Sequence, residues 1–244
     1  MRDIYSDPDL YDALHKDIGT DKEIISHYAR KCNGPVLELA SGTGRLAKYI
    51  IDLGLPYTGI DNSRSFLDKA INNFGNKGKF LLHDMRDFNL KRSYDFIFIG
   101  FNSFLHNLTD ENAVNCLHSV RSHLLDSGLF LLSIFLPDPN FLYREESLFE
   151  ARSYFYYKGQ KCRIMEKNSY DEESQINSLT WYLESDGILS DKPFSFKQKM
   201  YYPHMMDILF QQSGLKVLEK FGDWDRSVLE ETSPLQIYIC STDN

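Results

Sequence analysis

The sequence predicts an α/β fold, in which a mostly parallel sheet with helices on both faces is interrupted by an antiparallel β insertion. Two observations support this prediction. Strand-like and helical patterns alternate over about the first 140 residues, and aromatic-rich strand-like runs then follow between about 145 and 202. With 244 residues, 42% of them hydrophobic, the chain can form one substantial core and a small accessory layer.

Strands and helices alternate in the first part of the chain. A helix is expected at 109–128, capped at its start by Thr109 or Asp110 and terminated by Gly128. Helix-length crossovers between strands are typical of a parallel sheet covered on both faces. The expected strands are 35–39, 57–61, 79–84, 94–101 and 129–135, and the other helices are 44–54 and 63–75.

The insertion reads as an antiparallel meander, because its runs are rich in Tyr, Phe, Trp and Thr and are separated by short polar turns. After it we expect a helix with Pro203 near its start and Gly214 just past its end, then strands at 215–221 and 235–241. The strands outside the insertion add up to a seven-stranded, Rossmann-like sheet. The expected domains are therefore 1–144 with 203–244, and the insertion 145–202.

Composition disfavours several classes of protein. A formal net charge of −8 argues against nucleic acid and anionic membranes as partners, because such binding depends on clustered Lys and Arg. The four cysteines form no CxxC pair, so neither a zinc knuckle nor a dense disulfide framework is indicated. No apolar run reaches about 18 residues, and the acidic N-terminal segment does not resemble a signal peptide. We expect a cytoplasmic protein without a membrane partner.

A glycine turn follows the first expected strand. Residues 36–45 read Val-Leu-Glu-Leu-Ala-Ser-Gly-Thr-Gly-Arg, a strand that runs through small residues into a helix. Glycines let backbone N–H groups approach a ligand that side chains would block, although such a turn can also be only a tight connection. Glu38 within the strand is costly to bury without a partner, and the amino group of a methionine moiety would suit it.

A second acid ends the next strand. Asp61 is placed to accept both hydroxyls of a ribose, as an acid does at this position in nucleotide-binding sheets. Taken alone, Asp61 could also cap the following helix with Asn62 and Ser63. Two acids at successive strand ends favour a ligand site over that alternative.

These residues together resemble the first motif of class I S-adenosylmethionine-dependent methyltransferases, and the similarity covers most of the chain. The resemblance implies S-adenosylmethionine as cofactor and S-adenosylhomocysteine as product. Ala40 stands where many members have the first glycine, and we expect little loss from this small residue. The cofactor-binding residues that the resemblance implies are Glu38, Ala40, Ser41, Gly42, Gly44 and Arg45 in the first motif, Asp61 and Asn62 after the second strand, Asp84, Met85 and Arg86 after the third, and Phe101, Asn102 and Ser103 after the fourth.

Weaker features resemble the small-molecule N-methyltransferases, among them the aminosugar N,N-dimethyltransferases and glycine N-methyltransferase. Tyr11 resembles a tyrosine on an N-terminal helix that closes over the cofactor, and Tyr201 and Tyr202 precede a helix at Pro203 as in that branch. The branch also places an antiparallel insertion over its active site, so the insertion is expected to be a substrate lid. Each of these aromatic residues could equally pack in a core.

Methyl transfer from a sulfonium is an in-line displacement that needs alignment, exclusion of water and a free lone pair on the acceptor. An amine acceptor must be neutral, so a base can help. We expect His106, in the loop after the fourth strand, to be that base and to contact substrate; an adenine-side or capping role is the alternative. Tyr11 is a further catalytic candidate, and Tyr201 and Tyr202 are substrate-binding candidates that could form an aromatic pocket with it.

The predicted function is therefore methyl transfer to a small molecule, first an amine and second an oxygen. Two alternatives from other classes remain, a NAD-dependent oxidoreductase and a non-catalytic cofactor-binding module. A metal site at His83, Asp84 and Asp87 is disfavoured because no second ligand cluster is recognisable, and no metal is expected. Exposed strands of the insertion could pair between chains, which leaves a homodimer open.

Overall fold

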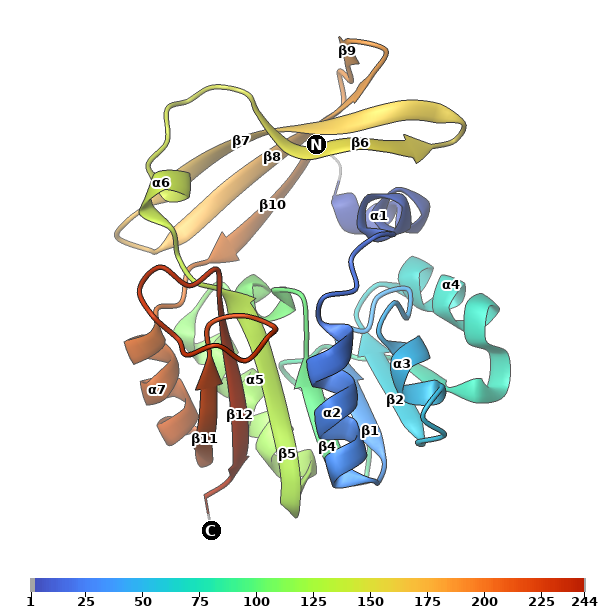
Figure 1. The fold of residues 1–244 in the computed structure, drawn as a ribbon, viewed down its shortest axis with the longest axis vertical. Helices are drawn as coiled ribbons and strands as arrows, with labels where there is room; N and C mark the ends of the chain where they lie inside the picture. Colours follow the sequence, from blue (N-terminus) through green and yellow to red (C-terminus); the bar gives the residue numbers. More distant parts are fainter. Residues whose placement is uncertain (1–2, 244) are drawn as a thin grey trace. The chain divides into compact units, whose positions relative to one another are not determined.

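The computed structural model describes residues 3–243, and these form two compact units (Figure 1). The main unit comprises Gly19–Leu136 and the described part of Tyr201–Asn244. The insertion unit comprises the described part of Met1–Ile18 together with Pro137–Met200. The N-terminal segment thus groups with the insertion, whereas the sequence division assigned all of 1–144 to the first domain.

The main unit contains a seven-stranded sheet with the strand order β11-β12-β5-β4-β1-β2-β3. Strand β12 pairs antiparallel with both β5 and β11, and the other pairings are parallel. This confirms the mostly parallel, Rossmann-like sheet. Its strands are β1 (Val36–Leu39), β2 (Tyr57–Asp61), β3 (Lys79–Leu82), β4 (Tyr94–Ile99), β5 (Leu124–Phe135), β11 (Leu215–Phe221) and β12 (Leu235–Thr242).

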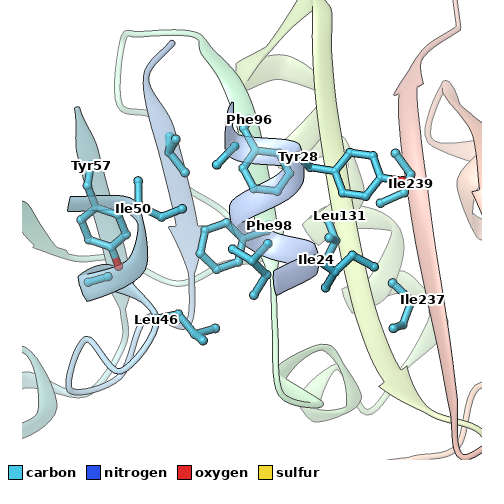
Figure 2. Packing of buried hydrophobic residues seen from close by; sticks show 14 of the residues in the cluster. Ile24, Tyr28, Leu46, Ile50, Tyr57, Phe96, Phe98, Leu131, Ile237 and Ile239 are labelled. Carbon is cyan, nitrogen blue, oxygen red and sulfur yellow. The ribbon is translucent and has the colours of Figure 1, made fainter. Parts of the chain in front are cut away.

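Helices cover both faces of this sheet. On one face, Ile24 and Tyr28 of α2 and Ile50 of α3 pack with Phe96 and Phe98 of β4 (Figure 2). On the other face, Phe210 of α7 packs against Tyr238 of β12, with ring centroids 5.0 Å apart, and α7 lies beside α5. The helices are α2 (Lys22–Cys32), α3 (Ala47–Ile51), α4 (Arg64–Phe74), α5 (Asp110–His123) and α7 (Pro203–Gln212), with short 3₁₀ turns η2 (Gly75–Lys77) and η3 (Ser103–His106).

Helix α5 is shorter than predicted. The Thr109 side chain accepts a hydrogen bond from the Asn112 N–H at 3.1 Å, which confirms the expected cap. The helix ends at His123, however, and 124–128 belong to β5, so the prediction of a helix up to Gly128 was wrong. Leu124 is extended, buried and paired with Tyr94 of β4, and burial of this apolar side chain in the sheet outweighs its helix propensity.

The insertion unit contains a second sheet, which is antiparallel as predicted, with the order β10-β8-β7-β6 and β9 beside β8. Ile4, Leu10 and Leu14 pack in one apolar cluster with Ile164 and Phe194 of this sheet, which explains why the N-terminal segment groups with the insertion. The elements are η1 (Ile4–Ser6), α1 (Pro8–His15), α6 (Pro139–Leu142), β6 (Phe149–Tyr157), β7 (Gln160–Asp171), β8 (Ile176–Ser185), β9 (Ile188–Leu189) and β10 (Phe194–Lys199). Within 3–243, no helix is both long and apolar enough to cross a membrane.

Candidate cofactor site

The turn after β1 contains three residues in the left-handed region. Ala40, Gly42 and Gly44 have φ values of +55°, +57° and +85°. A Cβ on Gly44 would lie 2.6 Å from Cε2 of Phe74, so this position requires glycine for both its φ value and its surroundings. The Gly44 N–H donates to the Ser41 carbonyl at 3.0 Å. Helix α3 therefore begins only at Ala47, later than the sequence pattern suggested.

Asp61 connects this turn to the next helix. Its Oδ2 accepts a hydrogen bond from the Gly42 N–H and its Oδ1 one from the Ser63 N–H, each at 2.8 Å. Burial raises the pKa of Asp61, and the backbone donors partly offset that effect. Additional hydroxyl donors would stabilise its charged form, which suits the expected ribose. The capping alternative is also present in part, because Asp61 accepts the N–H of Ser63, the residue that precedes α4, although the Ser63 side chain makes no capping hydrogen bond.

Glu38 is a buried acid on β1, with 4% of its surface exposed. The hydroxyl of Tyr57 on the neighbouring strand donates to Glu38 Oε2 at 2.6 Å. Burial raises the pKa of Glu38 to about 8, although the Tyr57 hydrogen bond and the Arg45 charge oppose that rise. This acid is therefore a group that a cationic ligand would stabilise.

Arg45 is paired with an acid that sequence reasoning missed. Its guanidinium binds Asp21 in bidentate fashion, with Nη2–Oδ2 2.5 Å and Nη1–Oδ1 3.1 Å. The guanidinium carbon also lies 4.8 Å from the centroid of the Phe101 ring. Asp21 precedes α2 but makes no capping hydrogen bond, so only its unusual burial distinguishes it from an ordinary helix-start residue.

The loop after β4 has a strained backbone and is held in place by a side-chain hydrogen bond. Phe101 and Asn102 have φ values of +57° and +66°, and Asn102 Oδ1 accepts a hydrogen bond from the Phe135 N–H at 2.7 Å. Ser103 then begins η3, which ends at His106. Such strain in non-glycine residues often marks a functional loop. The fully buried Tyr201 donates its hydroxyl to the carbonyl of Asn107 at 2.5 Å, so it fixes the segment that follows His106.

Asp84 and Arg86, after β3, form a closed pair. Asp84 Oδ1 accepts hydrogen bonds from Arg86 N at 2.9 Å and Nε at 2.8 Å. This partner lowers the pKa of Asp84. The carbonyl of Arg86 accepts a hydrogen bond from Ser119 Oγ of α5 at 3.2 Å. The loop with Met85 is thus held in place from both ends.

The sheet register brings most of the expected cofactor residues to one edge. Leu39 of β1 lies opposite Ile60 of β2 and Ile99 of β4, and Asp61 lies opposite Leu82 of β3. The glycine turn, Asp61 with Asn62, the 84–86 loop and the 101–103 loop therefore all leave the carboxyl ends of adjacent parallel strands, where ligands bind in such sheets.

The remaining expected residues are found elsewhere. Tyr11 lies on α1 of the insertion unit, where its ring centroid is 4.2 Å from that of His15, and its closure over a cofactor stays a prediction. Tyr202 is the residue that precedes α7, with its ring 6.0 Å from that of His204. A substrate contact by Tyr202 or by His106 also stays a prediction.

The insertion unit contains a buried polar cluster that sequence reasoning did not identify. Glu166 of β7 accepts hydrogen bonds from Arg144 Nη2 and from Trp181 Nε1, both at 2.5 Å. Arg144 Nε also donates to Asn168 Oδ1, and Asn168 donates to Asn177 Oδ1 at 3.3 Å. Asn168 and Asn177 appear in the sequence only as polar residues in strands, so alternation alone carried no signal for the cluster.

Comparisons with known proteins give one domain match and several similar folds. A methyltransferase domain model matches residues 36–128. No match was found among curated protein sequences. The chain is similar to the solved CcbJ methyltransferase from Streptomyces caelestis, with 21% identity, a TM-score of 0.82 and 99% of each chain covered. It is also similar to CalS10, an amino pentose methyltransferase from Micromonospora echinaspora solved with S-adenosylmethionine bound, with 13% identity, a TM-score of 0.74 and 96% of each chain covered.

A third similar structure is the sugar N-methyltransferase KedS8 from Streptoalloteichus sp ATCC 53650, with 13% identity, a TM-score of 0.74 and coverage of 98% of this chain and 93% of that chain. At these identities the structural likeness concerns the fold, and the domain match adds the activity. Residues 36–128 thus match a methyltransferase domain, and the whole chain shares its fold with solved methyltransferases, one of them with S-adenosylmethionine bound. The domain match indicates a methyltransferase and argues against the oxidoreductase alternative.

Proposed function

We propose that this methyltransferase transfers the methyl group of S-adenosylmethionine to an amine of a small molecule. The observation that carries the proposal is that the likeness to CalS10 and KedS8 extends over the insertion as well as the main sheet, with 96% and 98% of this chain covered. CalS10 is an amino pentose methyltransferase, and KedS8 is a sugar N-methyltransferase. Methyl transfer to a sugar nitrogen is consistent with both descriptions.

The residues at the sheet edge fit the cofactor chemically. Glu38 offers a buried carboxyl for the ammonium group of the methionine moiety, and Asp61 offers an oriented carboxylate for the ribose hydroxyls. The positive φ values of the turn after β1 bring backbone close to a ligand. When bound, the cofactor supplies a methyl group activated by its sulfonium.

The chain's own residues then bind the cofactor, accept a proton and exclude water. The 84–86 loop would hold the adenine, and the 101–103 loop would border the sulfonium. His106 accepts a proton from the acceptor ammonium, which frees the nitrogen lone pair for attack. Tyr202 lines the acceptor side and excludes water. Tyr201 supports His106 from within the core, because its hydroxyl is bonded to the Asn107 carbonyl.

Two substitutions test the division between binding and turnover. Asp61→Ala removes an acceptor of two hydroxyl hydrogen bonds and should weaken S-adenosylhomocysteine binding about 100-fold or more. His106→Ala should leave that affinity within about threefold and lower kcat about 100-fold. Asp68→Asn on α4, an exposed acid paired with Arg64, is the matched control and should behave like wild type.

Calorimetric titration and an assay with labelled S-adenosylmethionine and a panel of amino sugars measure these effects. Unchanged affinity in Asp61→Ala would show that the strand-end acid does not bind the ribose. A product that carries the label on oxygen rather than nitrogen would replace the amine acceptor by a hydroxyl, as in an O-methyltransferase.

A further inference from the structure

Glu38 is a buried acid whose cationic neighbour is engaged elsewhere. The hydrogen bond to Glu38 comes from a neutral group, the Tyr57 hydroxyl. The charge of Arg45 acts on Glu38, while its guanidinium is bidentate to Asp21. Asp21 and Asp61 add negative charge around Glu38. A charged carboxylate in this position is therefore costly unless a further cation approaches.

The main chain makes room for the contact between Tyr57 and Glu38. Gly59 lies directly opposite Glu38 in the sheet register. A Cβ at Gly59 would lie 2.7 Å from the Tyr57 hydroxyl and 2.6 Å from Ser41 Oγ. Any larger residue at position 59 would displace the hydroxyl, so the absence of a side chain there preserves the hydrogen bond.

The Tyr57 side chain is rigidly placed and stays protonated. Its ring is buried and packs against Phe80 with centroids 5.6 Å apart. Burial and the neighbouring Glu38 both raise the pKa of Tyr57 well above its usual value, so the hydroxyl remains a donor at every physiological pH. The donor can bind either the neutral or the ionised carboxyl of Glu38.

We propose that burial keeps Glu38 uncharged in the free protein, that Tyr57 is a positioning residue that orients its carboxyl, and that binding of the cofactor's ammonium group drives one proton from Glu38 to solvent. The proposal rests on the proposed binding of that ammonium group at Glu38. In this step the carboxyl O–H bond breaks, the proton leaves to water, and the carboxylate pairs with an ammonium that keeps its own protons.

The charge state follows from burial. With a pKa raised to about 8, Glu38 is mostly protonated at about pH 7 before the cofactor binds. Because one proton is released on binding, cofactor affinity should rise about tenfold per pH unit below that pKa and then level off. The titratable and charged groups that act on Glu38 are Tyr57, Arg45, Asp21 and Asp61.

Calorimetric titration with S-adenosylhomocysteine tests the proposal directly. Phosphate and Tris differ in ionisation enthalpy, so the difference between binding enthalpies measured in the two buffers counts the protons released. We expect about one proton for wild type at about pH 7. Glu38→Gln should bind more weakly and release none, and its affinity should be independent of pH between about 6 and 7.5.

Tyr57→Phe separates positioning from packing. It should lower affinity about tenfold and move the pH at which affinity levels off upwards, because the buried carboxyl loses the donor that stabilises its charge. Tyr49→Phe, which removes the hydroxyl of another tyrosine packed on the same core cluster, is the matched control and should match wild type in both respects.

Wild type that binds S-adenosylhomocysteine without proton release overturns the proposal but leaves the proposed function intact. Proton release that persists in Glu38→Gln places the titrating group elsewhere and also overturns it. A Tyr57→Phe variant with the wild-type pH profile overturns the role of Tyr57. No S-adenosylhomocysteine binding at any pH would overturn the proposed function as well.

Discussion

The two units both bury acidic residues, but they treat them differently. In the insertion unit, Glu166 is neutralised by Arg144 and also accepts a hydrogen bond from Trp181. In the main unit, Glu38 and Asp61 receive hydrogen bonds from a hydroxyl and from backbone N–H groups, and burial raises the pKa of both. A buried acid satisfied by a cation within the fold serves stability, whereas an acid with neutral donors favours an incoming ligand.

The largest effect on stability should come from a substitution in the buried polar cluster around Glu166. Arg144→Met leaves Glu166 buried without its cation and Asn168 without one donor, so we expect the free energy of unfolding to fall by about 3–5 kcal/mol. Affinity for S-adenosylhomocysteine should change by less than about threefold if this cluster is purely structural. Chemical denaturation measures the free energy of unfolding, and calorimetry measures the affinity.

The double variant Arg144→Met with Glu166→Gln is the matched control, because it removes both charges together. It should recover at least half of the lost stability, since no unpaired charge remains buried. A large loss of cofactor affinity in Arg144→Met would break the comparison and assign a cofactor-binding role to the insertion unit, in which Tyr11 lies.

The sequence was most informative where backbone geometry and charge occur in a short segment. The glycine turn, Asp61 and the strand alternation could all be recognised within a few residues, and the observed sheet matches the expected one. Glu38 could be predicted as a ligand-binding residue because it is a charged residue inside an apolar strand. Its partner Tyr57 carried no such signal, because tyrosine is an ordinary strand residue.

Contacts between residues far apart in the chain could not be predicted. Asp21 and Arg45 are separated by 24 positions, Arg144 and Glu166 by 22, and neither spacing follows a helical or strand period. The grouping of the N-terminal segment with the insertion has the same cause, because Leu10 and Phe155 meet only in the folded chain. The early end of α5 depends on the pairing of Leu124 with Tyr94, which is again a tertiary effect.

An intermediate effect is expected from substitution of Asp21. Like Glu166, this acid is paired with an arginine, but like Glu38 it lies near the proposed cofactor site. Asp21→Asn keeps the shape of the side chain but removes its charge, so Arg45 is no longer held beside Phe101. We expect S-adenosylhomocysteine affinity to fall about 10- to 100-fold, because the charge-assisted pair between Asp21 and Arg45 is lost.

Asp52→Asn, on a surface acid that follows α3, is the control for this loss of charge and should leave affinity unchanged. An Asp21→Asn variant with wild-type affinity would place Asp21 with the structural acids such as Glu166, and the pair would then no longer belong to the cofactor edge. Titration calorimetry of both variants decides between these outcomes. The salt concentration must be identical, because salt screens the exposed charge of Asp52 more than the buried charge of Asp21.

The smallest effect concerns backbone strain at Ala40, in the turn after β1. Ala40 adopts a φ value of +55°, which costs an L-residue about 1 kcal/mol relative to glycine. Ala40→Gly should therefore raise the free energy of unfolding by up to about 1 kcal/mol, less the entropy that glycine adds to the unfolded chain. The converse change is Gly54→Ala, at φ +76° with open space around the new Cβ, and it should destabilise by a similar amount. Paired denaturation curves measure both, and a destabilised Ala40→Gly variant would mean that contacts of the Ala40 methyl group outweigh its backbone strain.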